Sequence, residues 1–140
     1  DKAKQFSLLE ENKHPHATKS EDEARVVREG NEVHVYMTSI RTHFVPDNIE
    51  GVKVGDKVYF HVTNLEQDWD VPHGFAVLGA RNSELLVMPG ETRTLLWEPQ
   101  NGGVYPFYCT DFCSALHQEM QGYIRVSPKS SPIQISYNQR

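Results

Sequence analysis

Apolar and polar residues alternate along much of the chain, which is the period of a β-strand with one buried face. The segment Lys57–Asn64 shows this most clearly, because single polar or aromatic residues separate Val58, Phe60 and Val62. The segment Asn31–Thr38 has the same period. We expect about eight or nine short strands at intervals of roughly 8–12 residues, with no long helix. The pattern therefore predicts an all-β sandwich or barrel.

The two ends of the chain lack this alternation. Residues 1–29 are polar and carry charges of both signs, so they are predicted to be a linker or arm. Residues 128–140 are predicted to be a polar C-terminal tail, because Pro128 and Pro132 disfavour regular strand pairing. The strand pattern fills residues 30–127, which are predicted to form one domain.

Composition limits the possible partners. The 140 residues include 14 basic and 19 acidic side chains, giving a formal net charge of −5. This charge argues against nucleic acid and against an anionic membrane surface, and it suits a basic protein partner such as a small cytochrome. No apolar run approaches the roughly 18–20 residues that span a bilayer, so no membrane segment is expected in this chain. Two cysteines alone do not make a disulfide framework.

The chemistry-bearing residues gather in one stretch, residues 109–120, which holds all the cysteine of the chain. Two thiols, an imidazole and a thioether follow one another at spacings of four, four and three residues. Sulfur donors are soft and imidazole is borderline, so the set favours copper(I), zinc or iron–sulfur over magnesium or calcium. A fifth donor, His73, lies in an earlier loop that a Greek-key sandwich can bring to the same end.

A pair of cysteines indicates two metal ions, because two thiolates can bridge two coppers and spread one electron over both. The two histidines would each be a terminal ligand, and Met120 would be a weak axial ligand that tunes the potential. The backbone carbonyl of Asp111 would be the other axial ligand. Asp70 is the expected partner that orients the imidazole of His73. The proposed copper ligands are His73, Cys109, Asp111, Cys113, His117 and Met120.

Other interpretations of the cysteine pair remain open. Cys109 and Cys113 could form a disulfide in an oxidising compartment. Both could instead join two histidines in a structural zinc site, although zinc would not need Met120. A mononuclear copper site would leave Cys109 without a role. A catalytic cysteine is disfavoured, because the sequence offers no oxyanion hole and no third residue to orient a histidine base.

These residues resemble the binuclear copper CuA domain, found in subunit II of cytochrome c oxidase and in nitrous oxide reductase. The similarity rests on the cysteine, histidine and methionine spacing of residues 109–120, on residues 103–108 before it, and on residues 72–75 around the loop histidine. The resemblance implies a cupredoxin-like Greek-key β-sandwich or barrel over residues 30–127, with a polar N-terminal arm. It also implies two copper ions as the cofactor, held by the ligands already named.

Within that family, residues 112–123 look more like nitrous oxide reductase, since oxidase subunits typically have glycine where this chain has Ser114. The resemblance implies a periplasmic electron-transfer domain in denitrification. It would take electrons from cytochrome c or a small copper protein and pass them to a copper–sulfide cluster in the parent's catalytic domain, across a homodimer.

The seven histidines of this chain are scattered and cannot build that cluster, so the domain itself would not reduce nitrous oxide. The alternatives are the CuA domain of a cytochrome c oxidase subunit II, and a copper storage or delivery module.

Overall fold

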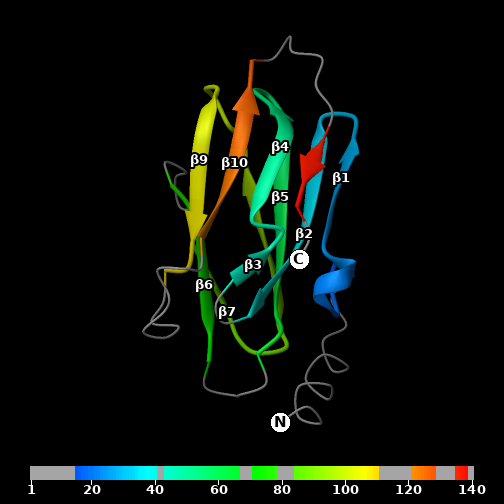
Figure 1. Cartoon of the computed structure of the whole chain (residues 1–140), viewed down its shortest axis with the longest axis vertical. Coiled ribbons are helices and arrows are strands. Elements are labelled where there is room, and N and C mark those ends of the chain that lie inside the picture. The colour runs from blue at the N-terminus through cyan, green and yellow to red at the C-terminus, as the bar shows by residue number, and fades with distance from the viewer. Residues whose placement is uncertain are drawn as a thin grey trace.

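The protein is a sandwich of two β-sheets, and the predicted all-β fold is confirmed (Figure 1). Only one short 3-10 helix, η1 (Glu21–Glu23), occurs among the described residues, and none of their helices is long and apolar enough to cross a membrane. The computed structural model describes residues 15–40, 43–66, 71–78, 84–110, 121–128 and 135–138.

The first sheet has the strand order β1-β2-β5-β8, with β3 paired to the far end of β2. Strands β2 and β5 run parallel and the other pairs run antiparallel, so the sheet is mixed. The strand β5 has the bounds that its alternation predicts. The strands are β1 (Arg25–Glu29), β2 (Glu32–Ile40), β3 (His43–Val45), β5 (Lys57–Asn64) and β8 (Thr92–Trp97).

The second sheet has the strand order β11-β4-β10-β9-β6-β7. Its pairs are antiparallel except β4 with β10. Strand β6 is buried along its whole length because it lies inside the sheet and faces the core. The strands are β4 (Asn48–Lys53), β6 (His73–Val77), β7 (Glu84–Val87), β9 (Gly103–Tyr108), β10 (Gln121–Ser127) and β11 (Ser136–Tyr137).

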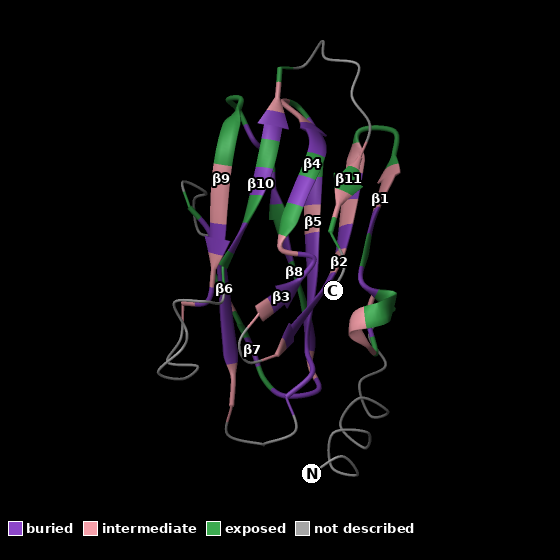
Figure 2. Ribbon diagram, in the orientation of Figure 1, coloured by how far each residue is buried: buried purple, intermediate pink, exposed green. Residues whose placement is uncertain are grey.

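The core lies between the two sheets and is built from buried residues of both. Figure 2 shows buried residues alternating with more exposed ones along several strands. Four phenylalanines form its centre, two from each sheet, and all four are fully buried. Their ring centroids lie 5.1–6.1 Å apart in tilted or edge-to-face pairs, the arrangements that aromatic rings prefer. They are Phe44 on β3, Phe60 on β5, Phe75 on β6 and Phe107 on β9.

The predicted N-terminal arm packs on the first sheet. Its last residues form the edge strand β1, and Thr18, which is fully buried, donates its backbone N–H to Thr63 Oγ1 at 3.0 Å. The ring of His16 stacks on the ring of His61 with centroids 4.1 Å apart. The arm therefore explains why His61 is buried, although its position in β5 points it away from the core.

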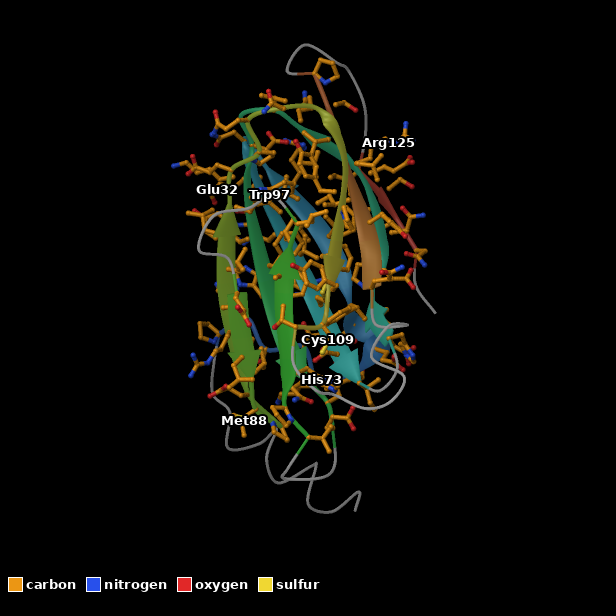
Figure 3. The ribbon with its side chains drawn as sticks, turned by 90° about the vertical axis from the view of Figure 1, so that its left-hand side faces the viewer. Glu32, His73, Met88, Trp97, Cys109 and Arg125 are labelled. Atoms are coloured by element: carbon orange, nitrogen blue, oxygen red, sulfur yellow. The ribbon has the colours of Figure 1, made fainter. Side chains whose placement is uncertain are left out.

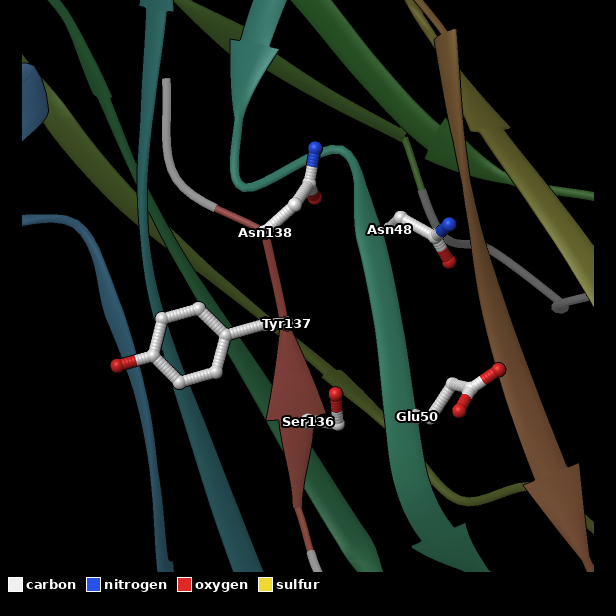
Figure 4. A pocket seen from close by; sticks show the side chains of 5 residues that line it. All are labelled: Asn48, Glu50, Ser136, Tyr137 and Asn138. Atoms are coloured by element: carbon white, nitrogen blue, oxygen red, sulfur yellow. The ribbon is translucent and has the colours of Figure 1, made fainter.

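The predicted C-terminal tail also contributes to the sheet. The strand β11 follows both prolines of this segment and pairs antiparallel with β4, so it covers the outer edge of the second sheet. The Asn138 amide donates to Asp47 Oδ1, and Asp47 N donates back to Asn138 Oδ1 at 3.2 Å. A pocket opens beside β11 and is lined by Asn48, Glu50, Ser136, Tyr137 and Asn138 (Figure 4).

Gly122, on β10, marks a close approach to strand β9 and to the residue just before β4. A Cβ atom at this position would lie 2.3 Å from the backbone oxygen of Asp47 and 2.5 Å from the ring of Phe107. We expect Gly122→Ala to lower the free energy of unfolding by about 3 kcal/mol, because the backbone must shift to admit the methyl group. Urea-induced unfolding would measure this loss.

Gly30→Ala is the matched control. Gly30 has a φ of +64° but no atom within 4 Å of the added Cβ. It should lose only about 1 kcal/mol, from left-handed backbone strain. Equal losses in the two variants would contradict the close packing at Gly122.

Candidate metal centre

His73 begins β6 and is fully buried. Its Nε2 lies 2.7 Å from Oε2 of Glu66, a carboxylate that is itself only 4% exposed. The Nε2–H group donates to this carboxylate, which fixes both the tautomer and the orientation of the ring. Among the described residues, hydrogen bonding holds the imidazole through Nε2 alone.

The other ring nitrogen, Nδ1 of His73, has no hydrogen-bond partner in the part of the chain that the structure describes. A buried polar atom without a partner is costly, and such an atom in a native protein needs an explanation. A histidine that binds a metal through one nitrogen usually donates its other N–H to a carboxylate, as His73 does to Glu66. The geometry fits a metal ligand at Nδ1.

Cys109 lies just beyond the neighbouring strand β9, at the same end of the sandwich as His73 (Figure 3). It follows directly after β9, whose Tyr108 pairs with Ala76, three residues beyond His73 in β6. The pairing of β6 with β9 thus brings together residues that are 36 positions apart in the sequence. Cys109 is 5% exposed and belongs to the core cluster.

The phenylalanine core supports the strand ends that carry His73 and precede Cys109. Phe75 lies two positions after His73, and Phe107 lies two positions before Cys109. Their ring centroids are 5.6 Å apart, and both rings are fully buried. Close packing of rigid rings excludes water and resists movement, so both donors are anchored to a stiff support.

One other group of side chains could hold a cation within the described ranges. Glu29, Glu32 and His34 place their ligand atoms within 4.8 Å of one another at the turn between β1 and β2. The two carboxylates are exposed or half-buried, and His34 already contacts Glu32 Oε1 at 3.2 Å. Figure 3 shows Glu32, a member of this group, well away from His73. It is a hard, solvated site, unlike the buried nitrogen and sulfur donors.

The histidines on the first sheet are engaged with one another. His34 Nδ1 lies 2.9 Å from His61 Nε2, and His61 Nδ1 lies 2.8 Å from Thr94 Oγ1. Sequence alternation predicts them to be surface or hydrogen-bonding residues, and both form such hydrogen bonds. They lie on the outer face of the sheet and take no part in the site at His73.

The sequences of two proteins of known function align with about three quarters of this chain. It is 38% identical over 104 residues to the nitrous-oxide reductase of Stutzerimonas stutzeri, a match that covers 74% of the chain and 16% of the enzyme. It is 35% identical over 102 residues to cytochrome c oxidase subunit 2 of Thermus thermophilus, covering 72% of the chain and 71% of that subunit. The chain thus spans only a small part of the reductases that it matches. No protein-family model matches the chain.

The chain belongs to the CuA-type cupredoxin domains. The fold agrees, since a heme-copper terminal oxidase solved by cryo-electron microscopy superposes with a TM-score of 0.64, at 22% identity, over 83% of this chain and 75% of that one. Membership makes this a copper-binding electron-transfer domain.

Four of the six proposed ligands of this CuA-type domain, Asp111, Cys113, His117 and Met120, lie outside the described residues. The Cys109 sulfur is disulfide-bonded, which is one of the alternatives that the sequence left open. A disulfide and a pair of thiolates are two oxidation states of the same sulfur atoms, and only the thiolate binds copper. The residues present fit copper once this bond is reduced.

The sequence did not identify Glu66 as part of the site. Asp70, the partner expected for His73, lies outside the described residues, and the observed partner is seven positions before the histidine. A charged residue in a polar loop is normally exposed. The available signal is that Glu66 lies only two residues after the strongly predicted strand Lys57–Asn64, so it is still close to the core.

We expect Glu66→Gln to weaken copper binding by at least about tenfold, because the neutral amide no longer supports the electron density of the imidazole. Competition with a copper chelator would measure this effect. Glu91→Gln is the control, because the Glu91 carboxylate is half-buried at the surface, accepts hydrogen bonds from Met88 N and Arg93 Nε, and does not contact His73. Equal copper affinity in both variants would show that Glu66 does not support a ligand.

Proposed function

We propose that this domain carries a binuclear CuA centre and relays electrons within a nitrous oxide reductase of the periplasm. It would accept electrons from cytochrome c or a small copper protein. It would deliver them to the catalytic copper–sulfide cluster of the parent enzyme, across a homodimer. The observation that carries the proposal is the buried Nδ1 of His73, which has no hydrogen-bond partner among the described residues and belongs to the strand that pairs with β9, just before Cys109.

The donor set supports two copper ions over one. A mononuclear site needs a single thiolate, whereas this chain has Cys109 buried at the strand end and Cys113 four residues later. The proposed roles are bridging thiolates for the cysteines, terminal imidazoles for His73 and His117, and axial contacts from Met120 and the Asp111 carbonyl. Two coppers bound in this way would store and release one electron.

The residues around the site favour fast electron transfer. Glu66 fixes one imidazole, and the four buried phenylalanines hold the strands that carry His73 and Cys109. Ligands that cannot move keep the same geometry in both oxidation states, which lowers the cost of each electron transfer. The same apolar core keeps water away from the sulfur atoms.

The surface near the site suits a protein donor. Leu86 on strand β7, which pairs with β6, and Met88 just after that strand are exposed over 49% and 42% of their area. Exposed apolar residues beside a buried redox site favour close contact with a partner. The net charge of −5 would steer a basic donor toward the domain.

Ser114 favours a nitrous oxide reductase over an oxidase as the parent. The oxidase remains the second candidate, because cytochrome c oxidase subunit 2 is a relative of similar identity. The complete gene product distinguishes them: a histidine-rich propeller indicates the reductase, and membrane helices ahead of the domain indicate the oxidase. Reversible one-electron cycling without copper loss would argue against a storage or delivery role.

We expect the domain, after reduction with dithiothreitol and removal of the reductant, to bind two coppers per chain. Two electrons and two protons convert the disulfide into two thiols, which then release their protons to the solvent on binding copper. Metal analysis and electron spin resonance would test this, with the spectrum of the oxidised domain split by two equivalent copper nuclei. The unreduced domain should not form the centre.

Cys109→Ser is the matched variant for this experiment. It removes one bridging sulfur and should give a mononuclear site or none. One copper per chain in the parent domain, or an S–S bond that persists with copper bound, would contradict the binuclear centre.

We expect Met120→Leu to keep both coppers but to shift the reduction potential, because an axial thioether is a weak ligand that tunes the metal more than it holds it. A redox titration followed by optical absorption would measure the shift. Met37→Leu makes the same chemical change at a fully buried core position of β2 and should leave the potential unchanged. Loss of copper in Met120→Leu would show that the thioether is a principal ligand.

A further inference from the structure

The side chain of Asn64, the last residue of β5, is fully buried and makes three hydrogen bonds. Its Nδ2 donates to the carbonyl oxygens of Val71 at 3.1 Å and Val87 at 2.9 Å. Its Oδ1 accepts the backbone N–H of Glu66 at 2.8 Å. The two donors and the acceptor are all used, so the amide has one orientation that satisfies its surroundings.

Each of these three bonds reaches a segment that determines where the His73 imidazole lies. Val71 is two residues before His73 on the incoming chain. Val87 is the residue of β7 that pairs with His73. Glu66 bonds to the imidazole directly. One buried amide therefore connects the approach to the histidine, the strand opposite it and its hydrogen-bond partner.

Asn64 is itself held in place by backbone bonds. Its N–H donates to the carbonyl of Glu91 at 3.0 Å, and its carbonyl accepts the N–H of Gly90 at 2.8 Å. The next residue, Leu65, donates its N–H to Ser39 at 2.8 Å. These bonds fix the backbone of Asn64 between β2 and the turn before β8, so the position from which its side chain extends is also fixed.

We propose that Asn64 is a positioning residue of the copper centre, which holds Glu66 and the approach to His73 so that Nδ1 of the imidazole faces the metal. This inference rests on the proposed function. The bond from Glu66 N to Oδ1 is a local turn of the kind that asparagine forms two residues ahead of itself. Aspartate would lack the two N–H donors, and serine would keep only part of the set.

Asn64→Ala and Asn64→Ser test this proposal, with Thr63→Val as the matched control. Thr63 is the preceding residue of the same strand and is also fully buried. Its hydroxyl oxygen lies 2.7 Å from Thr92 Oγ1 and accepts the Thr18 N–H. These partners lie on β8 and in the N-terminal arm, and neither belongs to the segment that carries Glu66. All three variants lose buried hydrogen bonds, but only the Asn64 variants free the segment that holds Glu66.

The first measurement needs no metal. Amide hydrogen exchange of the Glu66 N–H should be fastest in Asn64→Ala, intermediate in Asn64→Ser, and unchanged in Thr63→Val. In the copper-loaded domain, loss of copper to a chelator should be about tenfold faster in Asn64→Ala and within about twofold of the parent in Thr63→Val. The reduction potential and the electron spin resonance spectrum should change only in the Asn64 variants.

Equal copper loss, potential and spectrum in Asn64→Ser and Thr63→Val would overturn the positioning role, and this comparison stands even if Asn64→Ala fails to fold. If the parent domain binds no copper after reduction, the proposed function fails and the positioning role fails with it. If the parent binds copper but the variants match the control, only the positioning role is wrong.

Discussion

One buried hydrogen bond, from His73 Nε2 to Glu66 Oε2, is the constraint on which the site depends. It uses one nitrogen of the imidazole, and the other is buried with no hydrogen-bond partner in the described ranges of the chain. Burying a polar atom in this way costs free energy, unless a ligand repays it. Under the proposed function, this buried nitrogen is the atom that would bind copper, and its ligand would offset that cost.

The sandwich makes that donor useful by bringing sulfur to it. Tyr108, the last residue of β9, pairs antiparallel with Ala76, so the chain that leaves β9 at Cys109 runs toward His73, the first residue of β6. Phe75 and Phe107 anchor the two strands from below. Because both rings belong to strands of the sheet, the rigid packing of the core also restricts the movement of His73 and Cys109 at the ends of these strands.

Alternation of side chains was enough to predict the strand Lys57–Asn64 and the all-β fold, because the periodicity of a half-buried strand is local. The spacing of sulfur and imidazole groups predicted His73 and Cys109 as ligands, and their role as ligands stays a prediction. The roles of Glu66 and Asn64 could not be predicted, because their burial is created by the packing of distant segments. For the same reason, alternation could not show that the arm covers His61.

The net charge of the domain and its exposed apolar residues Leu86 and Met88 act at different distances. The proposed electron relay would use both. The net charge of −5 acts over about one Debye length, roughly 8 Å at physiological ionic strength, so it can speed an encounter without fixing its geometry. Leu86 and Met88 act only on contact, where they exclude water next to β6. A donor attracted by the first and oriented by the second would meet the domain close to His73. Weak contact of this kind lets the donor leave after each electron, as turnover of a relay requires.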